Sequence, residues 1–185
     1  MNQKRQLLID TALDLFYRYG VNSIGINEIL KVSGVAKKTL YSHFESKEAL
    51  ILATLEKRHV IFMGWLEEQL QKADVEENII PQLFAALEKW IDGTDSKLGC
   101  FRGCFFINTS AQFSDPNSAI SLSCRNHKAR IHHIVTQYMP HSDPLLIDAI
   151  CIMKEGVITA GYVANDHSAA KKRIEILNRL RQSFS

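Results

Sequence analysis

Apolar residues recur at intervals of three and four along most of the chain, and this spacing constrains the fold more than any other feature. In residues 4–19 the apolar positions are Leu8, Ala12, Leu15, Phe16 and Tyr19. Such spacing places them on one face of an α-helix, and Gly20 follows where a helix commonly ends in a left-handed residue. No segment shows the apolar–polar alternation of a half-buried strand, so the sequence predicts an all-α fold.

The same spacing predicts the remaining helices. Short helices are expected over residues 27–32 and 36–43, with a turn at Gly34, and Ser46 is a suitable N-cap for a long helix over residues 47–73. Further helices are predicted over residues 76–91, 145–164 and 169–184, and another from Asp115-Pro116 to Tyr138. Pro81 indicates that the helix over residues 76–91 begins or kinks there.

Composition and charge narrow the class of protein. No apolar run approaches the ~20 residues of a membrane span, and Asp10 and Asp14 interrupt the only stretch that could serve as a signal peptide. We therefore expect a cytoplasmic protein with no membrane partner. The first fifty residues hold seven Lys/Arg and five Asp/Glu, and the whole chain holds 22 and 20, so the entire excess of +2 lies there. This bias favours a polyanionic partner.

Residues 26–44 form the most informative segment. Ile26, Ile29 and Leu30 of one short helix can face apolar residues of the next, which leaves a polar side outside. The polar residues are Lys37, Lys38, Thr39, Tyr41, Ser42 and His43. An apolar back and a short polar front are what a DNA-reading helix requires, since lysines and hydroxyls can bind base edges or phosphates. Spacing alone is equally compatible with an ordinary helical hairpin that has a solvated polar face.

The motifs of this region resemble the N-terminal domain of the TetR family of repressors. They are Phe16-Tyr17-Arg18-Tyr19-Gly20, Gly34-Val35, Thr39-Leu40-Tyr41-Ser42-His43-Phe44 and Ser46-Lys47-Glu48-Ala49-Leu50. The resemblance covers about residues 5–55. One departure is Gly25, where members often have a Ser or Thr hydroxyl for a phosphate.

The resemblance implies a domain organisation and a function. A helix-turn-helix DNA-binding domain is expected over residues 1–48, joined by the long fourth helix to a helical ligand-sensing and dimerisation domain over residues 49–185. The implied function is a repressor that a small-molecule inducer releases from a palindromic operator on double-stranded DNA. The residues expected on DNA are Asn27, Lys37, Lys38, Thr39, Tyr41, Ser42, His43 and Lys47, and the alternative for Tyr41 and His43 is a partly structural role.

The same resemblance implies a homodimer through the last two helices and an inducer pocket among large apolar residues. Candidates for the pocket are Trp65, Phe84, Trp90, Phe101, Phe105, Phe106, Met153 and Tyr162, each of which can instead belong to the core. Leu145, Ile152 and Val157 give one of the last two helices a broad apolar surface. This surface can pack on a second copy of the chain or cover the protein's own core.

The cysteines suggest a second kind of signal. Cys104 and Cys100 flank Arg102, and the Gly103-Cys104-Phe105-Phe106 run is similar to that of a subset of the family, some of which respond to oxidants or electrophiles. A thiol beside a cation and a helix N-terminus is more easily deprotonated, so Cys104 is the first candidate for a redox sensor and Cys100 the second. The alternative is a buried thiol that acts as a small apolar residue.

Neither a cofactor nor an enzyme activity is predicted. Cys124-x-x-His127 and the Cys100/Cys104 pair contain zinc-ligand types, but nothing in the sequence brings the two pairs together. Gly-rich phosphate loops, Gly-x-Ser-x-Gly and His-Glu-x-x-His are missing from the sequence. A non-specific DNA-coating protein is a further alternative, and it requires far more positive charge than +2.

Overall fold

The computed structural model describes residues 3–183, and within that range the chain folds into α-helices and one 3₁₀ turn with no strand. The predicted all-α fold is thus confirmed. Among these helices, none is both long and apolar enough to cross a membrane. The chain divides into two compact units. The first contains the described part of Met1–Val60 together with Phe105–His127, and the second contains Ile61–Cys104 and the described part of Lys128–Ser185.

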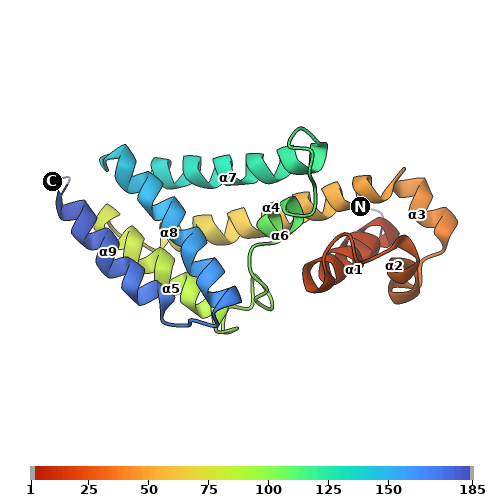
Figure 1. Ribbon diagram of the computed structural model, residues 1–185, viewed down its shortest axis with the longest axis horizontal. Coiled ribbons are helices and arrows are strands. Elements are labelled where there is room, and N and C mark those ends of the chain that lie inside the picture. The colour runs from red at the N-terminus through yellow and green to blue at the C-terminus, as the bar shows by residue number, and fades with distance from the viewer. Residues whose placement is uncertain (1–2, 184–185) are drawn as a thin grey trace. The chain divides into compact units, whose positions relative to one another are not determined.

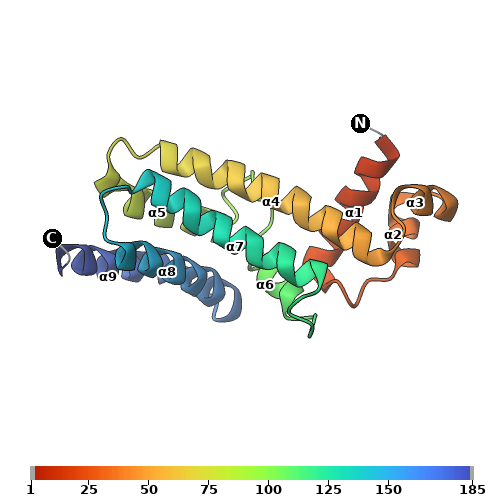
Figure 2. The ribbon, with the colours of Figure 1, turned by 90° about the horizontal axis from the view of Figure 1, so that it is seen from above.

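The first unit is built on α1 (Gln3–Tyr19), α2 (Ile26–Ser33), α3 (Lys37–His43) and the beginning of α4 (Lys47–Gln71). Figures 1 and 2 show α1, α2 and α3 grouped near the first turns of α4. Their shared core contains Leu8, Phe16, Ile29, Leu40 and Leu50, all fully or almost fully buried. Ser46 caps α4 as predicted, because its Oγ accepts a hydrogen bond from Ala49 N at 3.1 Å.

α6 (Phe105–Ser110) and the beginning of α7 (Ala119–Tyr138) complete the first unit. The α6–α7 loop is bonded to the α1–α2 loop through Gln112, whose Oε1 accepts from Asn22 N at 2.9 Å. Phe105 packs edge-on against Tyr17 of α1, with ring centroids 5.8 Å apart. The segment that returns to the first unit after residue 104 is therefore packed against α1.

The predicted start of α7 at Asp115-Pro116 is wrong. Asp115 Oδ1 accepts from Asn117 N at 2.9 Å, and this local bond folds residues 115–118 into a turn. Ser118 then caps the helix, since its Oγ accepts from Ser121 N at 3.2 Å. Pro116 consequently lies before the helix and not in its first turn.

The second unit packs α5 (Ile79–Ile91), α8 (Pro144–Val163) and α9 (Ala169–Ser183) against one another (Figure 1), with the later turns of α4 and α7. A 3₁₀ turn at Glu76–Asn78 precedes α5. Pro81 stands in the first turn of α5, in agreement with the prediction that the helix begins near it. The sequence predicted that the last helix, α9, extends to residue 184, which lies outside the described residues.

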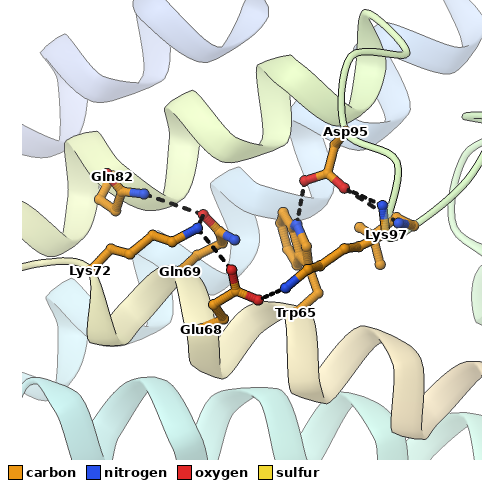
Figure 3. Close-up of polar contacts among 8 residues, drawn as sticks. Trp65, Glu68, Gln69, Lys72, Gln82, Asp95 and Lys97 are labelled. Carbon is orange, nitrogen blue, oxygen red and sulfur yellow. Dashed lines mark hydrogen bonds and ion pairs between the residues drawn. The ribbon is translucent and has the colours of Figure 1, made fainter.

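A polar network fixes the loop after α5 to α4 (Figure 3). The buried Trp65 donates its Nε1 proton to Asp95 Oδ2 at 2.7 Å. Asp95 Oδ1 also accepts from Lys97 N at 2.8 Å, and Glu68 forms ion pairs with Lys72 and Lys97. The Asp95 carboxylate thus accepts hydrogen bonds from the buried Trp65 indole of α4 and from a backbone amide of its own loop.

Candidate nucleic-acid interface

The α2–α3 pair has the geometry of a helix-turn-helix. Gly34 ends α2 with φ of 68°, a left-handed conformation, and donates its N–H to Leu30 O at 2.9 Å. Ile29 of α2 and Leu40 of α3 are both 0% exposed. The turn residue and the two buried side chains fix the orientation of α3.

The polar side of α3 faces solvent. Lys37, Lys38 and Ser42 are exposed, and the Tyr41 side chain is 44% exposed although it is large and aromatic. Thr39 is half-buried, and its carbonyl oxygen accepts from Ser42 Oγ at 2.8 Å. α3 therefore presents two ammonium groups, a phenol and a hydroxyl on one short helix.

His43, Asn27 and Lys47 flank this surface. Asn27 is exposed near the start of α2, and half-buried His43 lies edge-on to Phe44, with ring centroids 6.5 Å apart. The ammonium of Lys47 lies over the Phe16 ring, 5.9 Å from its centroid. Burial lowers the pKa of Lys47, and the charge of Glu48 opposes that shift. Lys47 thus both packs on α1 and places positive charge at the start of α4.

The predicted redox residues Cys100 and Cys104 lie in the second unit, and Cys104 is its last residue before the chain enters α6 of the first unit. The Cys104 Sγ is 3.2 Å from Lys128 Nζ, and the same ammonium donates to Glu155 Oε1 at 2.7 Å. Burial lowers the pKa of Lys128, but Cys104 and Glu155 raise it by more, so the net pKa lies above its ordinary value. The cation in contact with Cys104 is thus Lys128 from α7. Sequence reasoning pointed to Arg102 and missed Lys128, because 24 residues separate it from Cys104.

The other cysteines have different surroundings. Cys100 is exposed and Cys151 is half-buried. Burial raises the pKa of Cys151 to about 11, against the opposing charge of Lys154. Within residues 3–183, no three His, Cys, Asp or Glu side chains gather in a way that could hold a metal ion.

The residues predicted for an inducer pocket are distributed between the two units. Trp65, Phe84 and Trp90 are buried in the core of the second unit, whose ring contacts include Trp65–Trp90 at 6.4 Å and Trp90–Phe101 at 4.9 Å. Met153 is half-buried there and Tyr162 is exposed, whereas Phe105 and Phe106 belong to the first unit. A separate cavity of about 460 Å³ lies elsewhere in the second unit. It is lined by Val75, Glu76, Glu77, His141, Ser142, Asp143, Leu146 and Arg181.

Comparison with known proteins places this architecture in a family. Residues 8–54 match the family model of the bacterial regulatory proteins of the tetR family. The HTH-type transcriptional repressor ComR of Escherichia coli (strain K12) is 26% identical over 137 residues, which are 73% of this chain and 63% of ComR. The HTH-type transcriptional repressor NemR of the same strain is 30% identical over 111 residues, 60% of this chain and 54% of NemR. The chain thus spans less than two thirds of these relatives.

Solved structures agree with the fold over the full length. A TetR-family transcriptional regulator from Streptomyces coelicolor superposes with a TM-score of 0.83 at 22% identity, covering 100% of this chain and 97% of that chain. The reduced form of E. coli NemR gives a TM-score of 0.77 at 20% identity, with 96% of each chain covered. Residues 8–54 thus belong by sequence to the TetR family of bacterial regulatory proteins, and the whole chain has the fold of a solved TetR-family regulator.

Proposed function

We propose that the protein is a sequence-specific DNA-binding transcriptional regulator, and that it acts as a repressor. The observation that carries the proposal is α3, a short helix fixed by Leu40 and presenting Lys37, Lys38, Tyr41 and Ser42 to solvent. ComR and NemR, which the chain resembles, are both described as repressors. We propose that the DNA-contacting residues are the eight predicted from the sequence, within a DNA-binding domain that ends near residue 48.

Selection from random duplexes followed by affinity measurement tests this function. We expect one palindromic sequence to bind at least ~10³-fold more tightly than random DNA at physiological salt. Equal affinity for all duplexes contradicts the proposal. Lys38→Ala should weaken binding and lower the slope of log affinity against log salt by about one. The matched control is Lys89→Ala, which removes the same charge from an exposed position on α5.

We further propose a homodimer formed through α8 and α9. On α8, Leu145, Ile152 and Val163 are 62%, 70% and 76% exposed, respectively. Ala149 and Gly156 lie between them, so that the five positions are spaced by four, three, four and seven residues and form one apolar stripe with small residues that allow close helix approach. A second copy of the chain suits this stripe, because a palindromic site presents two half-sites to a two-fold dimer.

For the signal, we propose first a small-molecule inducer bound among those predicted pocket residues that lie in the second unit. Trp65 and Trp90 are the only tryptophans in the sequence, so their fluorescence reports on this region. Low-molecular-mass fractions of a cell extract can be tested for release of the selected duplex. We expect the releasing fraction to change tryptophan fluorescence, and release without such a change contradicts this pocket.

A redox signal at Cys104 is the second candidate, and the Lys128 contact favours it. An ammonium 3.2 Å from a sulfur stabilises the thiolate. The thiolate attacks peroxide to give a sulfenic acid, with hydroxide as the leaving group. We expect mild peroxide to release DNA from the wild type and from Cys100→Ser, and dithiothreitol to restore binding. Cys104→Ser should bind DNA but ignore peroxide, and a wild type that is indifferent to peroxide rules the proposal out.

A further inference from the structure

Two histidines meet inside the first unit at a position that the proposed function does not use. His59 of α4 and His127 of α7 approach with their Nδ1 atoms 2.9 Å apart. His127 is only 2% exposed, and its ring stacks on Phe106 of α6, with centroids 3.4 Å apart and planes inclined by 10°. This pair therefore joins three helices, and we call it the histidine pair.

A hydrogen bond between two Nδ1 atoms requires one proton between them. One imidazole must donate an N–H and the other must accept with a lone pair. The bond can form when both rings are neutral, in complementary tautomers, and when only one ring is charged. It cannot form when both rings are protonated, because both Nδ1 atoms are then donors and both rings are positive.

The surroundings of the histidine pair oppose a second positive charge. Arg58, next to His59 in the chain, is itself buried and lies 5.0 Å from the Tyr17 ring centroid, and its guanidinium stays charged at all relevant pH values. Asp10, the carboxylate that contacts this stretch of α4, is paired with Lys57, two residues before His59. α6 contributes the uncharged Phe106 ring, and the buried, uncharged Thr109 and Cys124 lie one turn from Phe106 and His127 on their respective helices.

We propose that the histidine pair is an acid-sensitive latch. It holds α6 and the beginning of α7 against α4 while at least one ring is neutral, and it opens when both rings are protonated. Burial of His127 and the charge on the first ring both oppose the second proton, so the latch opens only in acid. The latch bears on the DNA-binding helices, because α4 begins with the Ser46 cap and Lys47, and Phe105 of α6 packs on Tyr17 of α1.

The latch itself can be tested without DNA. His59→Asn keeps a short side chain with a hydrogen-bonding group but removes the titration, and half-buried His59 tolerates the change more readily than His127 does. Thermal unfolding is measured at pH 5.5, 6.5 and 7.5. We expect the wild-type midpoint to fall between pH 7.5 and 5.5 by about 2–4 °C more than that of His59→Asn. The matched control is His133→Asn, at an exposed position on α7, which should behave as the wild type.

Thiol labelling provides a second measurement on the folded protein. Cys124 is 4% exposed and lies one turn before His127. Dithiodipyridine reacts with thiols at acidic pH, and peptide mass spectrometry identifies the site. We expect labelling of Cys124 at pH 5.5 to be faster in the wild type than in His59→Asn. The latch proposal is wrong if unfolding and labelling depend on pH identically in the wild type and in His59→Asn. It is also wrong if a metal chelator abolishes the difference between the two proteins, because a metal ion bound to the histidines then explains that difference.

The consequence for DNA rests on the proposed function and is tested separately. Acid ordinarily strengthens DNA binding, because added positive charge favours a polyanion. The latch predicts the reverse, an affinity for the selected duplex that falls about fivefold or more between pH 7.5 and 5.5. This fall should be missing in His59→Asn, which retains His43. If no duplex is selected, the proposed function fails while the unfolding and labelling results still decide the latch.

Discussion

At the scale of single residues, Lys128 sets the chemistry proposed for Cys104. An ammonium group in contact with a sulfur donates a hydrogen bond to it and attracts the thiolate electrostatically. Replacing Lys128 with Met removes the ammonium that lies 3.2 Å from the Cys104 sulfur but retains a long apolar side chain. We therefore expect Lys128→Met to slow alkylation of Cys104 by iodoacetamide at pH 7, on the order of tenfold.

Two comparisons isolate this effect of Lys128. Lys89→Met makes the same change at an exposed site on α5, and exposed Cys100 provides an internal standard in the same protein. In Lys89→Met, Cys104 should react at its wild-type rate. In Lys128→Met, Cys100 should also react at its wild-type rate. Equal rates for Cys104 in Lys128→Met and the wild type show that the ammonium does not activate it.

Asp95 stabilises the fold through the hydrogen bonds that its carboxylate accepts. Its carboxylate accepts from the buried Trp65 indole and from two backbone amides, those of Lys97 and Leu98. Asp95→Ala leaves these donors without their acceptor, so we expect the free energy of unfolding to fall by about 1–3 kcal/mol. Urea denaturation measures the change, and Asp74→Ala, at an exposed position after α4, is the control expected to have little effect.

Residue patterns predicted local features and failed where partners are distant in the chain. The periodicity correctly placed Leu40 and Phe44 inside and Lys37 and Lys38 outside, because side-chain direction on a helix follows from spacing alone. The contacts of Cys104 with Lys128 and of His59 with His127 join segments 24 and 68 residues apart. Neither contact has a local signal, since each depends on how whole helices pack.

At the scale of elements, the turn between α2 and α3 depends on one glycine conformation. Gly34 has φ of +68°, where any side chain is strained even though nothing lies within 4 Å of the position that a Cβ would take. We expect Gly34→Ala to destabilise the protein by about 1–2 kcal/mol and Gly34→Asn by less, because Asn tolerates this conformation. Chemical denaturation measures both variants.

Gly64 offers the opposite case within α4. It is exposed in the middle of that helix and has open space at its Cβ position, so Gly64→Ala should stabilise by about 0.5–1 kcal/mol. The two alanine variants add the same methyl group, and backbone conformation alone gives their effects opposite signs. A loss of stability of equal size in both variants contradicts this explanation.

Helix ends were predictable where a cap or a breaker stands at the boundary. Ser46 before α4 is such a case, and its hydroxyl accepts the expected amide. The beginning of α7 was not predictable in this way, because Asp115 and Ser118 are both good capping residues three positions apart. The structure uses Asp115 for a turn and Ser118 for the cap, a choice that depends on the surrounding packing and not on propensity.

At the scale of the whole molecule, dimerisation and DNA reading should be linked. Ile152→Asp places a charge in the middle of the exposed apolar stripe of α8, where Ile152 is 70% exposed. We expect sedimentation equilibrium to give a monomer mass for this variant and a dimer mass for the wild type. The control is Val60→Asp, which adds a charge at an apolar position 61% exposed on α4 and should leave the mass unchanged.

The same variant separates the dimer from the DNA-contacting residues. Ile152→Asp leaves Lys37, Lys38 and Tyr41 intact, so each monomer should bind an isolated half-site with wild-type affinity. On the full palindrome the wild type gains from two linked contacts, whereas the monomer makes each contact independently. We therefore expect the variant to lose affinity by about 10²-fold or more on the palindrome alone. An equal loss on both duplexes means that the substitution damages the DNA-binding unit itself, and an unchanged affinity on the palindrome means that α8 is not the dimer interface.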